Sequence, residues 1–256
     1  MNFALSKEQK MLQKSVRQYI KKRCPNTFVK ELAASEKGYS TELWKEMADL
    51  GWMGLVFPDE YEGSSFSFFD LVIFFEEMGY NICPGPLFST IVLSGLPILN
   101  YADNKLKSKI LPKISTGEII LTMAVTEENA DYKPESIKTS AIKEGDEYII
   151  NGTKLFVNDA HVSDYILCAA RTEDTLNPDD GVTLFIVKAT APGVNISLMK
   201  NVTLEKPCEV NFENVIVPSE NIIGELNNGW MIVNDTIEKA ALVKRAEMIG
   251  GASGTM

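Results

Sequence analysis

Apolar side chains recur along the first part of this 256-residue chain every three or four positions, as on one face of a helix. Ser6 and Gln9 have the spacing of a capping box at the start of the first such stretch. Gly51, Gly79 and Gly117 follow later stretches and are expected to end helices there. The pattern predicts helices whose apolar faces span Leu12–Ile20, Phe28–Leu32, Leu43–Leu50, Phe68–Met78, Leu87–Leu99 and Leu106–Ile114.

From Ile119 onward the apolar residues gather in short runs separated by turn residues, which is typical of strands. Gly145, in Glu144-Gly145-Asp146, and Gly152, after Asn151, mark two expected turns. Helical spacing returns after Gly229. Because helices come first and strands second, the order favours segregated domains over a doubly wound fold. The expected strands lie within 119–125, 140–157, 165–170, 183–187, 194–199 and 209–217.

These patterns predict a multi-domain α and β protein. We expect an all-α N-terminal helical domain at residues 1–118, an antiparallel β-barrel middle domain at 119–226, and the start of a C-terminal helical bundle at 227–256. The last helix is rich in small residues from Ala240 to Ala252, which suit close packing against another helix. A lone helix after a barrel has little of its own chain to bury itself against. We therefore expect an incomplete last domain and an oligomer.

Composition and charge limit which partners and which cellular compartment are expected. Hydrophobic residues make up 45% of the chain and charged residues 23%, as in globular proteins with a sizeable core. The net charge of −10 disfavours nucleic acid and anionic membranes as partners. The chain contains no apolar run of the roughly 18 residues that cross a bilayer, and its start lacks the order of a signal peptide. We expect a cytoplasmic protein.

Metal sites and the common catalytic motifs are not apparent. The four cysteines have no C-x-x-C spacing and His161 is the one histidine, so we expect neither a metal site nor a disulfide framework. The phosphate-binding loops, the G-x-S-x-G nucleophile turn and the H-E-x-x-H zinc motif are missing as well. For His161 a surface or loop-packing role is favoured over catalysis.

Several longer segments, taken in order, resemble the acyl-CoA dehydrogenase family. They read GWMGLVFP at 51–58, AVTE at 124–127, IKTSA at 137–141, YIINGTK at 148–154 and FENVIVPSEN at 212–221. Gly224 and Gly229-Trp230 then match the beginning of that family's second helical domain. Each segment is moderately specific, and the ordered set covers essentially the whole chain.

The resemblance implies an oxidoreductase of fatty acid metabolism. Members of this family use FAD to dehydrogenate an acyl-CoA thioester between Cα and Cβ, with electron-transfer flavoprotein as the expected electron acceptor. A homo-oligomer, or a mixed oligomer with a homologous subunit, is implied too. Two alternatives stay open: a non-catalytic partner subunit of such a mixed oligomer, and another flavin enzyme on the same scaffold, an oxidase or a monooxygenase.

The resemblance also places the flavin. It implies that Met123, Val125 and Thr126 at the end of the first barrel strand hold the pyrimidine edge of the ring through backbone N–H groups and the threonine hydroxyl. It implies a second contact at Phe156-Val157-Asn158, with the Phe156 ring packed against the flavin. Asn158 stands where the family has a hydroxyl residue, and its amide can donate a hydrogen bond in its place.

Two segments depart from the family pattern. After Glu127 the family has a Gly-Ser-Asp turn, whereas residues 128–134 here contain neither glycine nor serine. A backbone with positive φ is not easily formed by most of these residues. An arginine that the family carries on the last helix is also missing, and Lys239, Lys244 and Arg245 are candidates to replace it.

No catalytic residue is assigned. The family takes the α proton with a glutamate, and one of its two known places for that residue matches Ala240 here, which cannot accept a proton. Glu238 lies about 200° around the helix from Ala240, and Glu247 lies about two turns further along. We classify Glu127 as structural. The catalytic base is therefore expected to be missing from this chain, which alone is expected to be inactive.

Overall fold

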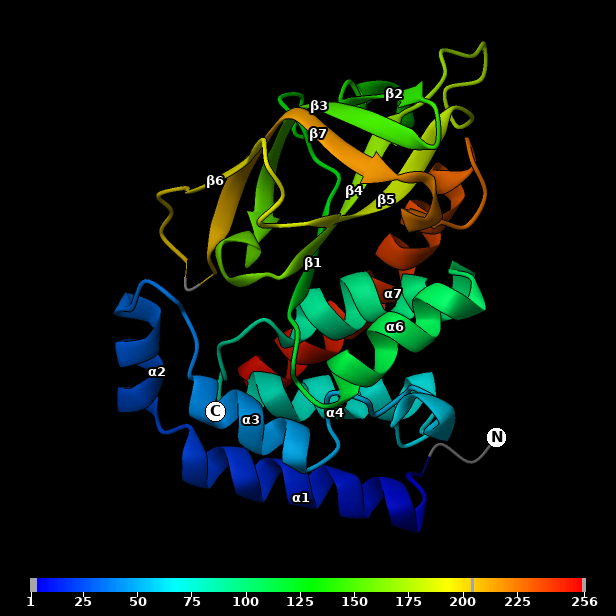
Figure 1. Cartoon of the computed structure of the whole chain (residues 1–256). Coiled ribbons are helices and arrows are strands. Elements are labelled where there is room, and N and C mark those ends of the chain that lie inside the picture. Colours follow the sequence, from blue (N-terminus) through cyan, green and yellow to red (C-terminus); the bar gives the residue numbers. More distant parts are fainter. Residues whose placement is uncertain (1–3, 204, 255–256) are drawn as a thin grey trace.

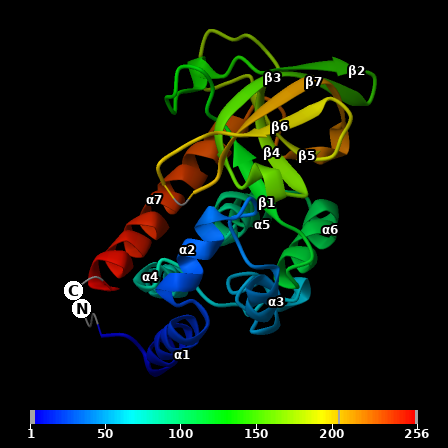
Figure 2. The same cartoon turned by 90° about the vertical axis from the view of Figure 1, so that its left-hand side faces the viewer.

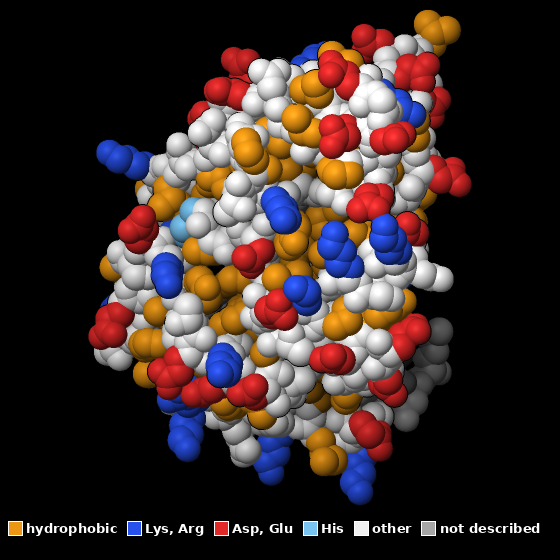
Figure 3. Space-filling view, in the orientation of Figure 1, with side chains coloured by type: hydrophobic (Ala, Val, Ile, Leu, Met, Phe, Trp, Pro, Cys, Tyr) orange, Lys and Arg blue, Asp and Glu red, His pale blue; other side chains and the backbone are white. Residues whose placement is uncertain are grey.

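The computed structural model describes residues 4–203 and 205–254. A layer of helices lies beneath a curved β-sheet, and one long helix, α7 (Gly229–Gly254), runs along both (Figures 1 and 2). The predicted fold class is confirmed. Acidic and basic side chains alternate over the face shown in Figure 3. In the part of the chain that the structure describes, no helix has the length and apolar character needed to cross a membrane.

The helical layer follows the predicted apolar stripes. The capping box at Ser6 forms, with Gln9 N–H donating to Ser6 Oγ at 3.1 Å and Ser6 N–H donating to Gln9 Oε1 at 2.9 Å. The stretch from Leu87 begins with a π-helical segment, η2 (Phe88–Gly95). The α-helices are α1 (Lys7–Arg23), α2 (Asn26–Ala34), α3 (Thr41–Asp49), α4 (Phe68–Tyr80), α5 (Leu96–Tyr101) and α6 (Asn104–Ser115).

The middle part of the chain forms an eight-stranded sheet in the order β6-β7-β3-β2-β4-β5-β8, with β1 paired to β4. Most pairs are antiparallel, as predicted, but β1 and β2 each pair with β4 in parallel. The strands are β1 (Leu121–Ala124), β2 (Ser140–Glu144), β3 (Glu147–Asn158), β4 (Tyr165–Arg171), β5 (Val182–Lys188), β6 (Val194–Leu198), β7 (Pro207–Pro218) and β8 (Ile222–Ile223).

One of the two expected turns in this region is wrong. Gly145, with φ of +62°, makes the turn between β2 and β3 as predicted. Asn151-Gly152 instead lies inside β3, where the pairing with β7 shifts register between Ile150 and Gly152. A Cβ on Gly152 would lie 2.6 Å from the Thr139 Cα, so this glycine permits a close backbone approach within the sheet. The Asn151-Gly152 pair therefore lies at a β-bulge. Bulges and tight turns both favour glycine, because both can require a backbone with positive φ.

A shared core ties the sheet to the helices. It is built from apolar side chains of α5, α6, β1, β4, β5 and α7, among them Ile98, Leu121, Leu167 and Val233. The Thr90 hydroxyl of η2 and the backbone of Leu121 exchange two hydrogen bonds of 3.2 Å each. Strand β1 is therefore fixed from both layers.

Helix α7 packs against α4 through glycines. A Cβ on Gly79 of α4 would lie 2.0 Å from the Glu247 carbonyl oxygen, and one on Gly250 would lie 1.8 Å from the Glu76 carbonyl oxygen. Two expectations are thereby corrected. Gly79 lies within α4 and does not end it, and the small-residue face of α7 finds its partner helix in its own chain (Figure 2).

This contact makes a matched pair of substitutions informative. Gly250→Ala forces the two helix backbones apart, so we expect the free energy of unfolding to fall by about 2 kcal/mol or more. A Cβ on the neighbouring Gly251 would lie 3.5 Å from the Gly79 carbonyl oxygen, an ordinary contact. Gly251→Ala should therefore leave stability unchanged or raise it by up to about 1 kcal/mol, because alanine favours helix. Urea unfolding of both variants measures the difference, and equal stabilities would contradict this packing.

Candidate active site

A β-bulge near the end of β3 turns one aromatic side chain out of the sheet. The pairing of β3 with β7 shifts register between Lys154 and Val157. Phe156, inside the bulge, has a left-handed backbone with φ of +56°, and 52% of its side chain is exposed. Such a backbone costs a non-glycine residue about 1–2 kcal/mol, and strain of this kind is concentrated at functional sites. The bulge therefore leaves the Phe156 ring accessible from outside the sheet.

The end of β1 meets this bulge. Leu155 N–H donates to the Thr126 carbonyl oxygen at 2.8 Å, and the Thr122 hydroxyl donates to the Asn158 carbonyl oxygen at 2.6 Å. The two segments that the sequence singled out separately, 123–126 and 156–158, are thus held side by side.

A cavity of about 280 Å³ opens where the two segments meet. Five of the six predicted site residues line it: Met123, Val125, Thr126, Phe156 and Asn158. The sixth, Val157, is buried in the hydrophobic core of the β-sheet. The remaining lining residues were not predicted to bind the flavin, although Ala240 and Lys244 were singled out from the sequence for other roles. These remaining residues are Phe88, Leu93, Tyr132, Leu155, Ile237, Ala240, Ala241 and Lys244.

Most of these further lining residues come from two helices, η2 and α7. Ile237, Ala240, Ala241 and Lys244 lie on one face of α7 at helical spacing, a signal that the sequence does carry. Of the three basic residues proposed to replace the missing arginine, Lys244 is the one that lines this cavity. Lys239 instead pairs with Asp235, with 2.6 Å between Nζ and Oδ2.

Two hydrogen-bonding groups on the wall are available to a ligand. Thr126 N–H and the side-chain amide of Asn158 have no hydrogen-bonding partner within residues 4–203 and 205–254. Both residues line the same cavity as Phe156, whose ring is exposed. A flat aromatic face with donors at its side fits a planar ring that carries hydrogen-bond acceptors, and the isoalloxazine of FAD is such a ring.

The loop after Glu127 adopts the positive φ that its residues were expected to resist. Ala130 has φ of +52°, and its N–H donates to the Glu127 carbonyl oxygen at 2.9 Å. A single hydrogen-bonded turn therefore forms without glycine. Tyr132, within the segment that departs from the family pattern, comes to line the cavity.

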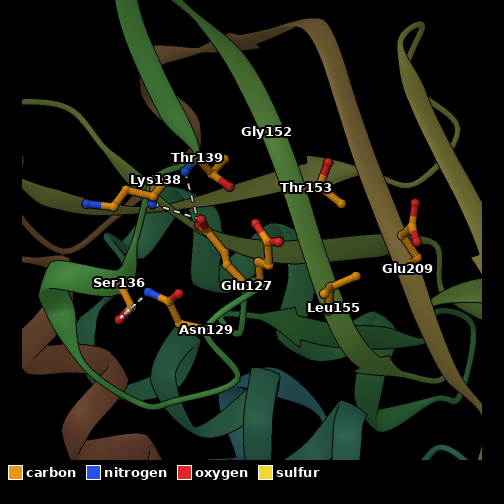
Figure 4. A pocket seen from close by; sticks show the side chains of 10 residues that line it. Glu127, Asn129, Ser136, Lys138, Thr139, Gly152, Thr153, Leu155 and Glu209 are labelled. Atoms are coloured by element: carbon orange, nitrogen blue, oxygen red, sulfur yellow. Dashed lines mark hydrogen bonds between the residues drawn. The ribbon is translucent and has the colours of Figure 1, made fainter.

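Glu127 is held by its neighbours in the sheet and lies beside a second, larger cavity of about 610 Å³ (Figure 4). Its carboxylate accepts from Lys138 N–H at 2.8 Å and Thr139 N–H at 3.0 Å. The buried Lys154 ammonium donates to it at 2.7 Å and to the Val125 carbonyl oxygen at 3.1 Å. Burial would raise the pKa of Glu127, but Lys154 and the two N–H groups outweigh burial and lower that pKa below its ordinary value. Glu127 is thus an ionised structural group.

No described carboxylate lines the 280 Å³ cavity. Ala240 is in its wall, whereas Glu238 is exposed and accepts a hydrogen bond from Asn234 at 3.1 Å. Glu247 lies on a neighbouring cavity. The helical geometry expected for these residues therefore agrees with the structure.

His161 contacts loops away from this cavity. Its Nε2 lies 3.1 Å from the Glu36 carbonyl oxygen and 3.2 Å from that of Lys37. Its Nδ1 lies 3.7 Å from the sulfur of buried Cys208. These contacts join the sheet to the segment between α2 and α3, which is a packing role.

Comparison with known families decides the identity of this fold. The model of the acyl-CoA dehydrogenase N-terminal domain matches residues 6–118, and the model of the middle domain matches residues 122–215. The chain belongs to the acyl-CoA dehydrogenase family.

Similar proteins agree with this assignment. Mitochondrial isovaleryl-CoA dehydrogenase of Pongo abelii is 29% identical over 265 residues, which cover 98% of this chain and 60% of the relative. The structure of butyryl-CoA dehydrogenase from Megasphaera elsdenii has a TM-score of 0.90 at 26% identity, covering 99% of this chain and 68% of that one. The ChsE4-ChsE5 complex from Mycobacterium tuberculosis has a TM-score of 0.81 at 26% identity, covering 93% and 61%. The chain spans about half to two thirds of the length of the curated relatives it matches.

The ion pair beneath the site gives a test of stability and its pH dependence. Glu127→Gln leaves the Lys154 ammonium buried without its carboxylate, so we expect the free energy of unfolding to fall by about 3–5 kcal/mol near neutral pH. In the native chain the pKa of Glu127 is lowered, so the pair's stabilisation is complete above the unfolded pKa of about 4.3. It is lost as the pH falls from there through the folded pKa.

Urea unfolding at neutral and acidic pH measures both effects. The native chain should lose more stability on acidification than Glu127→Gln does. A double variant, Glu127→Leu with Lys154→Met, removes both charges and should be more stable than the single variant. A single variant as stable as the native chain would show that the pair contributes nothing.

Proposed function

We propose that this chain is an acyl-CoA dehydrogenase-like flavoprotein that binds FAD at the 280 Å³ cavity and an acyl-CoA thioester beside it. The observation that carries the proposal is the junction of β1 with the β3 bulge. At this junction the exposed ring of Phe156, the N–H of Thr126 and the side-chain amide of Asn158 belong to residues that line one cavity, and neither donor has a partner among the described residues.

The residues of this junction have distinct roles in the proposal. Phe156 packs against the flat ring, and Thr126 and Asn158 donate hydrogen bonds to its acceptors. Donors placed there stabilise the negative charge that develops on reduction. When bound, FAD supplies the acceptor for the hydride that leaves Cβ of the acyl group.

The apolar wall from η2 and α7 has a different role. Phe88, Leu93, Ile237 and Ala240 line the cavity on the side of the helices. In the proposal they hold the acyl group against the ring plane and exclude water from it. Exclusion of water strengthens the hydrogen bonds made by Thr126 and Asn158, because charge is screened less in an apolar site.

Removal of the α proton needs a carboxylate within hydrogen-bond reach of it. The described lining of the cavity contains none, and Ala240 offers no proton acceptor. We therefore propose that the 256 residues do not supply the base. The same observation favours the second candidate, a partner subunit that contributes structure or part of a site. Electron-transfer flavoprotein as the electron acceptor, the cytoplasm as compartment and the alternative oxidase or monooxygenase chemistry stay predictions.

FAD binding is tested at Phe156. Phe156→Asp removes the aromatic face and places a negative charge beside the flavin ring that Thr126 and Asn158 are proposed to bind. Flavin retention should therefore fall by at least about tenfold. Ile142→Asp, at an exposed apolar side chain of β2 away from the cavity, is the control and should retain flavin. Flavin absorbance per folded chain after gel filtration is the measurement. Equal flavin content in native chain and Phe156→Asp would refute the assignment.

The missing base is tested at Ala240. We expect no dehydrogenation by the native chain, loaded with FAD, in an assay with an artificial electron acceptor and a range of acyl-CoAs. Ala240→Glu places a carboxylate on the cavity and should raise turnover by about a hundredfold over background. Ala240→Gln has the same size without a proton acceptor and should not. Turnover by the native chain that is lost in Glu238→Gln would show that the base was misplaced.

Assembly is proposed on the outer face of α7. Leu242, Met248 and Ile249 remain about half exposed or more, although the opposite face of the helix is buried on α4. An uncovered row of large apolar side chains on one helix favours contact with another chain. Light scattering at micromolar concentration should show a dimer or larger species, and Leu242→Glu with Ile249→Glu should convert it to monomer. A native chain that is monomeric alone and with a homologous subunit would contradict the proposal.

A further inference from the structure

A third cavity, of about 360 Å³, adjoins the candidate active site. Phe88, Asn158 and Lys244 line both cavities. The Lys244 ammonium lies 4.3 Å from the centroid of the Phe88 ring, so this pair stands at the boundary between them. An acyl chain that extends past Phe88 would therefore enter the 360 Å³ cavity.

The two cavities differ in chemistry. The first has a mostly apolar wall with Lys244 as its one charged described residue. The second is lined by apolar side chains as well, among them Ile82 and Pro84, but it adds the charged residues Asp159, Glu205, Lys206 and Glu247 to Lys244. Three carboxylates thus face two ammonium groups. Carboxylate oxygens therefore outnumber ammonium groups on the described lining of this cavity.

Each ammonium group already has a hydrogen-bonding or ion-pair partner in the chain. Lys244 Nζ lies 2.8 Å from Glu247 Oε2 and 3.7 Å from Glu205 Oε1. Lys206 donates to the Ala33 carbonyl oxygen at 2.8 Å. One oxygen of Asp159 accepts from the Ser89 hydroxyl at 2.5 Å. A carboxylate arriving here would meet a net negative charge, and a methyl group would remove water from charged groups without replacing its hydrogen bonds.

We propose that the acyl group bound by this chain carries a hydrogen-bond donor, a hydroxyl or an ammonium, at its far end, seated among Asp159, Glu205 and Glu247. This inference names the substrate class and rests on the proposed acyl-CoA function. Lys244 over Phe88 marks where the apolar part of the chain ends.

Isothermal titration of the folded chain with acyl-CoAs of equal length tests the proposal without turnover. The series is octanoyl-CoA and its eight-carbon analogues with a terminal hydroxyl, amino or carboxyl group, repeated at six carbons. The hydroxyl- and amino-ended thioesters should bind about tenfold tighter than the methyl-ended one, as expected for a hydrogen bond to a charged group. The carboxyl-ended thioester should bind most weakly.

A substitution in the third cavity provides the internal check. Glu247→Leu removes one acceptor at similar size, so the preference for donor-ended chains should shrink and methyl-ended chains should bind tighter. Glu238→Leu, on the exposed face of the same helix, is the control and should keep the native preference. Tighter binding of methyl- or carboxyl-ended chains by the native protein overturns this inference alone. Binding of none of the acyl-CoAs overturns the inference together with the proposed function.

Discussion

The buried ion pair between Glu127 and Lys154 is the contact on which the candidate site depends. Lys154 reaches from β3 to the carboxylate and to the Val125 carbonyl oxygen at the end of β1. Glu127 in turn receives the backbone N–H groups of Lys138 and Thr139, which lead into β2. Three segments are therefore joined at one point. Because buried charges without partners are strongly unfavourable, the segments have little freedom to separate.

This junction explains how a strained aromatic residue can persist. The bulge places Phe156 in a left-handed conformation that an isolated strand would not adopt. The residues before and after it are held, since Leu155 donates to Thr126 and Asn158 accepts from Thr122. The cost of the backbone is offset by contacts on both sides, and the result is an exposed ring on a rigid base. A planar ligand would meet a preorganised surface there.

The second constraint is the close approach of α7 and α4. Backbone contact at Gly79 and Gly250 sets the height and rotation of α7, and this in turn presents Ala240 and Lys244 to the cavity. The helix therefore acts as one wall of the site as well as a brace between layers. Its chemistry on that wall is apolar with one cation and without a carboxylate in the described lining. Binding and positioning are thus supported better than proton abstraction, which is why a partner subunit remains a serious alternative to an enzyme.

The sequence alone was sufficient for the order of helices and strands, the capping box at Ser6 and the two segments that form the site. These features follow from local periodicity and from motifs read in order, which need no knowledge of distant contacts. The sequence also showed that Ala240 cannot act as a base, because this depends only on residue type.

Only the tertiary structure decided what distant residues do to one another. Gly79 and Asn151-Gly152 were expected to end a helix and to form a turn, but contacts with α7 and with Thr139 use the same glycines for close packing. The partner of α7, the buried side of Val157 and the charged cavity beyond Lys244 were likewise set by chain segments far apart in sequence. A glycine or a small residue in the sequence indicates that another part of the chain packs closely there. Which segment packs there depends on the fold of the whole chain.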